Sequence, residues 1–365
     1  MPILSERNAR LWLRRISVLA ATAVCLLLAG CGSSNSTPAP PPPPPAPIGH
    51  AYVTTANSLL GYSIAASNGA LTPITTPAGA PGGSDITSNA QKNLVYTLTS
   101  SGQISGYTLN RSDGSLTAIA GSPWGGAGVG VAFLTVDAAG QYLFVPATQD
   151  LTVVPYTIGS TGALTIGLEV STPKAPLTAT VDPPGHFLYV PIGSTGTELY
   201  QIAGGALVDV ETIPPLGQGG AVYVAINPAD TFAYISDGLS GVAAYSINAT
   251  TGGLTPLAGS PFTAAAGTSA LALTPNGKFL YVASTAAITG FTINADGSLT
   301  SVGISVTFPQ PPLVLSIDTT GAYLYVLNNN SNSVSVYQIN ATTGVLTVEP
   351  GITLSTVPTG ITTTP

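Results

Sequence analysis

From residue 50 onward, short apolar segments alternate with polar turns in a pattern that recurs along the chain. In its clearest copy, an apolar segment at 270–273 is followed by the turn Pro-Asn-Gly at 275–277 and a second apolar segment at 279–282. Apolar positions of this spacing, bounded by Gly and Pro, predict β-strands joined by tight turns. We therefore expect an all-β protein.

Three short elements each recur seven times, 44 to 48 residues apart for the first of them. The first element is the aromatic residue of Leu-Tyr-Val, found at Tyr52, Tyr96, Phe144, Tyr189, Tyr234, Tyr281 and Tyr325. The second is an aromatic residue two positions before an apolar one, as at Tyr62 and Tyr107, and the third is a leucine after a Gly turn, as at Leu71. A period near 45 with several short strands is typical of propeller blades. The sequence predicts a seven-bladed β-propeller with four antiparallel strands per blade, named A to D from the centre outward.

The two ends of the repeat complement one another. The chain enters the pattern in a strand B at 51–53, and its last segment, 360–365, aligns with the strand A at 270–275. We expect the C-terminal strand to pair into the N-terminal blade and close the ring, which leaves only short sheet edges. The alternative, an open β-solenoid, predicts stricter spacing and no such complementarity.

Composition supports this fold class. Charged residues make up only 6% of the 365 residues, against 42 glycines and 32 prolines. Lys and Glu, which fill helix surfaces, are too rare for a helical protein. An apolar content of 44% is too high for a disordered chain.

The amino terminus reads as an export signal. Four arginines between residues 7 and 15 precede an apolar run at 16–28, which is shorter than the roughly 20 residues of a transmembrane helix. The following Leu-Ala-Gly-Cys at 28–31 resembles the lipobox of bacterial lipoproteins. That resemblance implies removal of residues 1–30, acylation (for example with palmitate) of Cys31, and anchoring to a membrane of the cell envelope. The residue after this cysteine is Gly32 rather than Asp. In lipoproteins of Gram-negative bacteria, this resembles the pattern of those that are sent to the outer membrane. A plain secretory signal with an incidental cysteine is the alternative.

A tether follows at 31–47. It is rich in Ser and Pro, with eight prolines between residues 38 and 47, and such runs favour an extended polyproline II spacer. A proline motif that binds a partner is the other interpretation. The expected domains are the signal peptide 1–30, the tether 31–47 and the propeller 48–365. Cys25 would leave with the signal, so the mature chain would have no disulfide.

Charge excludes a nucleic-acid partner. Without residues 1–30, four basic and fourteen acidic side chains remain. The basic ones lie far apart in the sequence, at Lys92, Arg111, Lys174 and Lys278. Binding along a phosphate backbone needs clustered Lys and Arg.

Candidate site residues come from the loops expected at one end of the central channel, where the B–C and D–A loops meet. These loops offer six candidate side chains: Asp85, Asp150, Glu198, Asp237, Trp124 and Lys174. The repeat does not explain the four carboxylates. The carboxylates would converge as Ca²⁺ ligands or an acid/base pair, or would only solubilise the loops. No Ca²⁺-loop spacing is present, and no metal or cofactor is expected. Trp124 is either a stacking platform or a plug against the neighbouring blade.

The opposite end carries five Asp residues and one His, most of them at one repeated position before or within a turn. An Asp in such a turn bonds its own turn backbone, and we expect this role for most of the set. Its members are Asp137, Asp182, His186, Asp230, Asp296 and Asp318. The second histidine, His50, lies at the tether junction. No H-E-x-x-H or G-x-S-x-G motif is present.

Taken together, Leu-Tyr-Val, Tyr-x-Ile, Gly-x-Leu-Thr, Gly-Ser-Pro and Pro-x-Gly resemble the seven-bladed propeller lactonase family that includes 6-phosphogluconolactonase. The resemblance covers residues 50–365 and implies metal-free hydrolysis of a sugar lactone in the channel. Members of that family carry His, with Arg nearby, on some inner strands. The corresponding segments here, 175–183, 219–228 and 267–275, contain neither, so no residue carries over as catalytic.

The sequence therefore favours a monomeric, lipid-anchored envelope propeller that binds a small molecule or a protein without chemistry of its own. The alternative is a lactone hydrolase that uses Asp150 and Glu198 on an unphosphorylated lactone. A third possibility is an assembly scaffold. Two carboxylates about 5–9 Å apart at the channel mouth would favour hydrolysis.

Overall fold

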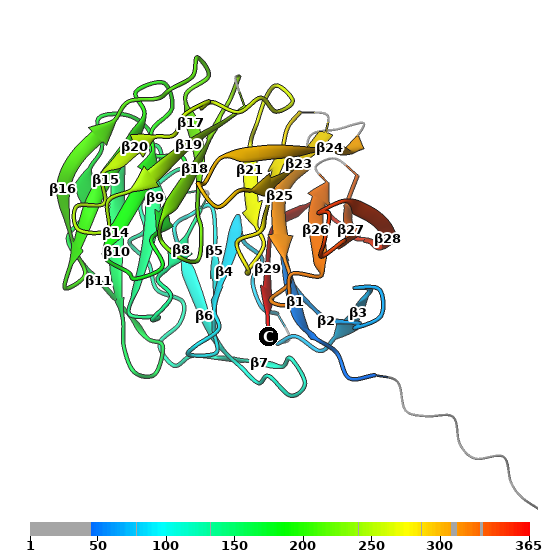
Figure 1. Ribbon diagram of the computed structural model, residues 1–365. Coiled ribbons are helices and arrows are strands. Elements are labelled where there is room, and N and C mark those ends of the chain that lie inside the picture. Colours follow the sequence, from blue (N-terminus) through cyan, green and yellow to red (C-terminus); the bar gives the residue numbers. More distant parts are fainter. Residues whose placement is uncertain are drawn as a thin grey trace, which may run out of the picture. The chain divides into compact units, whose positions relative to one another are not determined.

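Seven antiparallel sheets make up the folded part of the chain (Figure 1). The computed structural model describes residues 45–365, apart from 78, 132, 240, 286, 308–311 and 329–330, and these residues form no helix. The sheets confirm the predicted all-β propeller of seven blades. The predicted signal peptide, Cys31 and the tether up to residue 44 lie outside the described residues.

The innermost strands neighbour one another in a closed circle, so that each blade points outward from the centre. From the innermost to the outermost strand, blade 1 consists of β29 (Pro358–Thr364), β1 (Gly49–Thr55), β2 (Leu59–Ile64) and β3 (Leu71–Ile74), and blade 2 of β4 (Asp85–Asn89), β5 (Leu94–Leu98), β6 (Ile104–Leu109) and β7 (Leu116–Ala118). Blade 3 consists of β8 (Thr135–Val136), β9 (Tyr142–Ala147), β10 (Thr152–Ile158) and β11 (Leu164–Ile166), and the short strand β12 (Val170–Ser171) also pairs with β10. Blade 4 consists of β13 (Thr180–Val181), β14 (Phe187–Pro191), β15 (Thr197–Ala203) and β16 (Ala206–Ile213).

The last three blades follow the same order. They are β17 (Ala221–Ile226), β18 (Phe232–Asp237), β19 (Gly241–Ile247) and β20 (Leu254–Pro256) in blade 5; β21 (Ala270–Leu273), β22 (Phe279–Ala283), β23 (Ala287–Ile293) and β24 (Leu299–Thr307) in blade 6; and β25 (Pro312–Ile317), β26 (Tyr323–Asn328), β27 (Ser333–Ile339) and β28 (Leu346–Thr353) in blade 7.

The ring closes through the two ends of the domain. Strand β29 pairs antiparallel with β1, with Thr364 opposite His50 and Ile361 opposite Val53, and Figure 1 shows the red strand beside the blue one. The C-terminal segment therefore supplies the inner strand of blade 1, as the phase of the repeat predicts.

The core lies between the blades. The buried apolar side chains form seven clusters, and each cluster joins two neighbouring blades. The Leu-Tyr-Val pattern explains this arrangement. Successive side chains of a strand point to opposite faces of the sheet, and therefore toward the two blades on either side. In blade 4, Tyr189 packs toward blade 5, whereas Leu188 and Val190 pack toward blade 3.

One kind of side-chain hydrogen bond recurs between six of the seven neighbouring pairs of blades. The hydroxyl of the strand-B tyrosine donates to the carbonyl of a glycine in the C–D turn of the next blade. These bonds are Tyr52 to Gly114, Tyr96 to Gly162, Tyr189 to Gly252, Tyr234 to Gly297, Tyr281 to Gly344 and, across the closure, Tyr325 to Gly69, at 2.6 to 3.0 Å. We call them the tyrosine clasps. Phe144 of blade 3 has no hydroxyl and makes none.

Candidate functional site

Two aromatic side chains from neighbouring inner segments border a small cavity at the starts of the inner strands. The rings of Phe133, before β8, and Tyr223, on β17, meet edge to face with centroids 6.4 Å apart. With residues of β21 and β25 they line a cavity of about 10 Å³. A single water needs about that much room, so this cavity is too small for a sugar.

Asp85 is the candidate carboxyl that lies in this channel. It opens the inner strand β4, is 7% exposed, and its Oδ2 accepts a hydrogen bond from the Leu134 amide at 3.0 Å. Burial raises the pKa of Asp85 to about 7. Burial, and then the charge of Asp85, raise the pKa of Tyr223 to about 12, so the two groups lie close enough to interact.

Three of the other candidates lie in loops. Exposed Asp150 accepts a hydrogen bond from the Val129 amide at 2.6 Å and so holds the loop that leads into blade 3. Lys174 is exposed between β12 and β13. Trp124 is half-buried: its backbone pairs with Ile104, and its ring packs against the cluster between blades 2 and 3.

Glu198 lies on β15, two strands outward from the channel. It is 3% exposed, and its Oε1 accepts a hydrogen bond from the Thr212 hydroxyl at 2.7 Å. Burial raises its pKa. A carboxyl in this place is part of the interior of blade 4.

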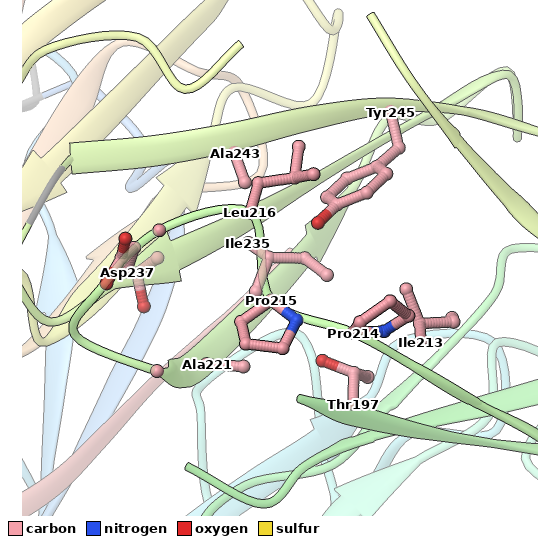
Figure 2. A pocket seen from close by; sticks show the side chains of 13 residues that line it. Thr197, Ile213, Pro214, Pro215, Leu216, Ala221, Ile235, Asp237, Ala243 and Tyr245 are labelled. Atoms are coloured by element: carbon pink, nitrogen blue, oxygen red, sulfur yellow. The ribbon is translucent and has the colours of Figure 1, made fainter. Parts of the chain in front are cut away.

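Asp237 ends β18 and borders a small pocket between blades 4 and 5 (Figure 2). Its Oδ1 accepts a hydrogen bond from the Gly219 amide at 2.5 Å, and its buried Oδ2 has no partner among the described residues. Pro214 and Pro215 lie over the pocket, and Tyr245 points its hydroxyl toward it. The pocket holds about 10 Å³, again the space of one water.

The four carboxylates are distributed over four blades. Asp85, Asp150, Glu198 and Asp237 belong to blades 2, 3, 4 and 5 or to the loops between them, and no hydrogen bond joins any two of them. Each instead accepts a hydrogen bond from its own surroundings. Within residues 45–365 as described, no group of three or more His, Cys, Asp or Glu residues is arranged to hold a metal ion. No helix there is long and apolar enough to cross a membrane.

At the other end of the channel, most turn carboxylates play the expected role. Asp182 Oδ1, for example, accepts hydrogen bonds from the amides of His186 and Phe187 at 2.7 and 2.9 Å. The further carboxylates bonded to their own turns are Asp137, Asp296 and Asp318. The expectation is wrong for Asp230, because Asn227 holds that turn and the buried Oδ1 of Asp230 has no partner in the described part of the chain. Burial, and then the charge of Asp182, raise the pKa of Asp230 to about 6.

Sequence reasoning missed a large groove on the turn face. A groove of about 550 Å³ opens between blades 6 and 7 on the face of the A–B and C–D turns. Its lining comes from three separate turns and strand ends, whose proximity no single repeat reveals. A smaller hollow of about 180 Å³ lies on the loop face between blades 1 and 2, lined by Gly, Ala, Ser and Thr.

Comparison with known proteins identifies the family. The model of the lactonases with a seven-bladed β-propeller matches residues 46–352. The chain belongs to this family. It is 27% identical over 228 residues to a 6-phosphogluconolactonase of Serratia proteamaculans, which covers 59% of this chain and 69% of that protein.

Solved structures show the same fold. A protein of Bacteroides fragilis superposes with a TM-score of 0.75 at 18% identity, over 86% of this chain and 97% of that one. The periplasmic gluconolactonase of Pseudomonas aeruginosa superposes with a TM-score of 0.69 at 19% identity, over 86% and 98% of the two chains.

Proposed function

We propose that this lactonase-family propeller is a lipid-anchored binding module of the cell envelope, which binds a small molecule or a protein and does not hydrolyse lactones. The small size of the cavity between Phe133 and Tyr223 is the observation that carries the proposal. The family resemblance implies hydrolysis in the channel, but Phe133 and Tyr223 leave a cavity of about 10 Å³ there.

Electrostatics supports the same proposal. Binding a phosphorylated sugar favours Arg or Lys at the phosphate, and the inner segments 175–183, 219–228 and 267–275 carry no His or Arg. The single arginine of the described domain, Arg111, donates to Asn93 and to the Ala90 carbonyl at the turn face of blade 2. It therefore lies away from the channel cavity.

A panel of lactones tests the proposal. The full chain, purified in detergent, is incubated with phosphorylated and unphosphorylated sugar lactones, and acid release is followed at constant pH. We expect rates no higher than in buffer alone. Turnover of any member above that background would overturn the absence of chemistry.

One observation favours the second candidate, hydrolysis of an unphosphorylated lactone. Asp85, with a pKa of about 7, is a carboxyl whose basicity suits proton transfer at neutral pH. The neighbouring Tyr223 hydroxyl would then stabilise the developing oxyanion. The Pseudomonas neighbour is named as a periplasmic gluconolactonase. Turnover that disappears in Asp85→Asn would establish this candidate.

A further inference from the structure

The groove between blades 6 and 7 is large enough for an organic ligand. Its volume of about 550 Å³ lies within the 300–1,000 Å³ of typical ligand clefts. The cavity beside Phe133 and Tyr223 and the pocket beside Asp237 hold about 10 Å³ each. One wall comes from the A–B turn of blade 6, and the other from the A–B and C–D turns of blade 7 together with the ends of β27 and β28.

The lining is polar but uncharged. None of its described residues is Asp, Glu, Lys, Arg or His. Its polar side chains are amides and hydroxyls, namely Thr274, Asn276, Thr320, Gln338, Asn340, Thr342 and Thr347. Gln338 and Thr347 are exposed and lie opposite one another on β27 and β28. Amides and hydroxyls both donate and accept hydrogen bonds, as the hydroxyl groups of a sugar require.

Two of the amides are held in fixed orientations. Asn276 Oδ1 accepts hydrogen bonds from the Thr274 hydroxyl and the Lys278 amide, at 2.8 and 3.0 Å. Asn340 Oδ1 accepts hydrogen bonds from the amides of the two turn residues 342 and 343, both at 3.0 Å. With both oxygens occupied, the Nδ2 groups remain as donors on opposite sides of the groove. Donors held in place lose less conformational entropy on binding.

Lys278 fixes the two walls relative to each other. Its ammonium group donates to the carbonyls of Ala341 and Thr342 at 2.8 and 3.2 Å and lies 5.0 Å from the centre of the Phe279 ring. It thereby joins the A–B turn of blade 6 to the C–D turn of blade 7. Because this ammonium is bonded to two carbonyls, it is a structural link rather than a site for an anion.

We propose that this groove binds a neutral carbohydrate, a glycan of the cell envelope. The inference rests on the proposed function as a binding module and names its ligand class. An anionic ligand would find no cationic side chain in the lining, and a cationic ligand no carboxylate. An apolar ligand would bury the amides without partners, which costs free energy. An uncharged molecule rich in hydroxyl groups meets none of these penalties.

Titration calorimetry with defined oligosaccharides tests the proposal on the full chain. The probes are chitotetraose, cellotetraose and maltotetraose as neutral glycans, with tetragalacturonate and chitosan tetramer as charged ones. We expect binding of at least one neutral probe, and a loss of about tenfold in affinity in Gln338→Ala, as for one or two hydrogen bonds. Gln201→Ala is the matched control, because Gln201 is exposed at the same repeat position of blade 4 and should leave affinity unchanged.

Several outcomes would overturn the assignment. They are absence of binding by all neutral probes, tighter binding of a charged probe, or equal affinities in the two glutamine variants. Unchanged melting temperatures of both variants would show that any loss reflects the groove and not the fold. The lactone panel on the same preparation separates the two proposals: turnover there contradicts the module without chemistry, whereas absent glycan binding contradicts only the groove.

Discussion

The strand-B tyrosines combine two tasks in one side chain. Their rings are buried between blades, and their hydroxyls pair with turn carbonyls of the next blade, as Tyr325 does with Gly69 at 2.9 Å. The acceptor turn needs glycine, because Gly69 has a φ of +65° and an added Cβ would lie 2.5 Å from the Tyr323 ring. Burial raises the pKa of every clasp tyrosine, so the hydroxyls stay protonated donors.

Loss of one clasp should destabilise the ring measurably. Tyr325→Phe removes the hydroxyl and leaves the Gly69 carbonyl buried without its partner, so we expect the free energy of unfolding to fall by about 1–3 kcal/mol. Urea unfolding measures the loss. Tyr142→Phe is the control, because no hydrogen bond of the Tyr142 hydroxyl is found in the described structure. Equal losses in the two variants would contradict a stabilising role for the clasp.

Asp85 should make stability depend on pH. Its pKa of about 7 in the fold exceeds the ordinary 3.8, so the folded state binds the proton more tightly than the unfolded state. This contribution is fully present below pH 3.8 and is lost as the pH rises through about 7. Relative to the wild type, Asp85→Asn should therefore gain roughly 2.5 kcal/mol in free energy of unfolding between pH 5 and pH 8.

The difference between the two proteins is the quantity to measure, by urea unfolding at several pH values. This difference separates the contribution of Asp85 from that of His50. Burial lowers the pKa of His50, so His50 changes the pH dependence of stability in the opposite direction. Parallel pH profiles for wild type and Asp85→Asn would show that Asp85 does not titrate in this range.

Among the elements, β29 bonds to three strands at once. Besides its pairing with β1, Thr362 shares a hydroxyl hydrogen bond with Ser88 of β4 at 2.7 Å, and Thr363 donates to the Ile317 carbonyl of β25 at 2.8 Å. The threonine-rich end of the chain thus supplies hydroxyls to both neighbouring inner strands. A strand so placed ties blade 1 to blades 2 and 7.

Removal of residues 358–365 should therefore open the ring. The truncated chain loses the inner strand of blade 1 and exposes the edge of β1, which is a template for aggregation. We expect loss of the single cooperative thermal transition and a higher oligomeric state on size exclusion. Deletion of residues 38–45, of the same length but in the tether, should change neither. A monomer with wild-type melting behaviour after truncation would contradict this role of β29.

Elements within one repeat and the closure of the ring were predictable, whereas side-chain contacts between blades were not. Local patterns suffice for the turn bonded to Asp182 and for the strand at 360–365, since both follow from one copy of the repeat. The clasp from Tyr52 to Gly114 spans two copies, so neither copy reveals it. Inner strands β8 and β13 have only two residues each, which the repeat does not predict. The burial of Asp85 depends on the packing of several blades around the channel.

For the whole molecule, the face at which the described chain enters the propeller is also the face that carries the groove between blades 6 and 7. Strand β1 starts at Gly49, and His50 lies against the C–D turn glycine Gly114 and the end of β29. Residues 45–48 therefore join the domain at the turn face. A glycan in the groove would be bound on the face at which these residues enter.

The proposed anchor depends on one of two cysteines. Cys25 lies inside the apolar run and Cys31 at the expected cleavage site, so acylation is expected at Cys31 alone. Cys31→Ser should abolish incorporation of a labelled palmitate analogue and move the protein from the membrane to the soluble fraction, because a protein without acyl chains loses that hydrophobic attachment. Cys25→Ser is the matched control and should keep both label and membrane association. Labelling of the Cys31→Ser protein, or its retention in membranes, would contradict the anchor and leave the signal as a plain secretory one.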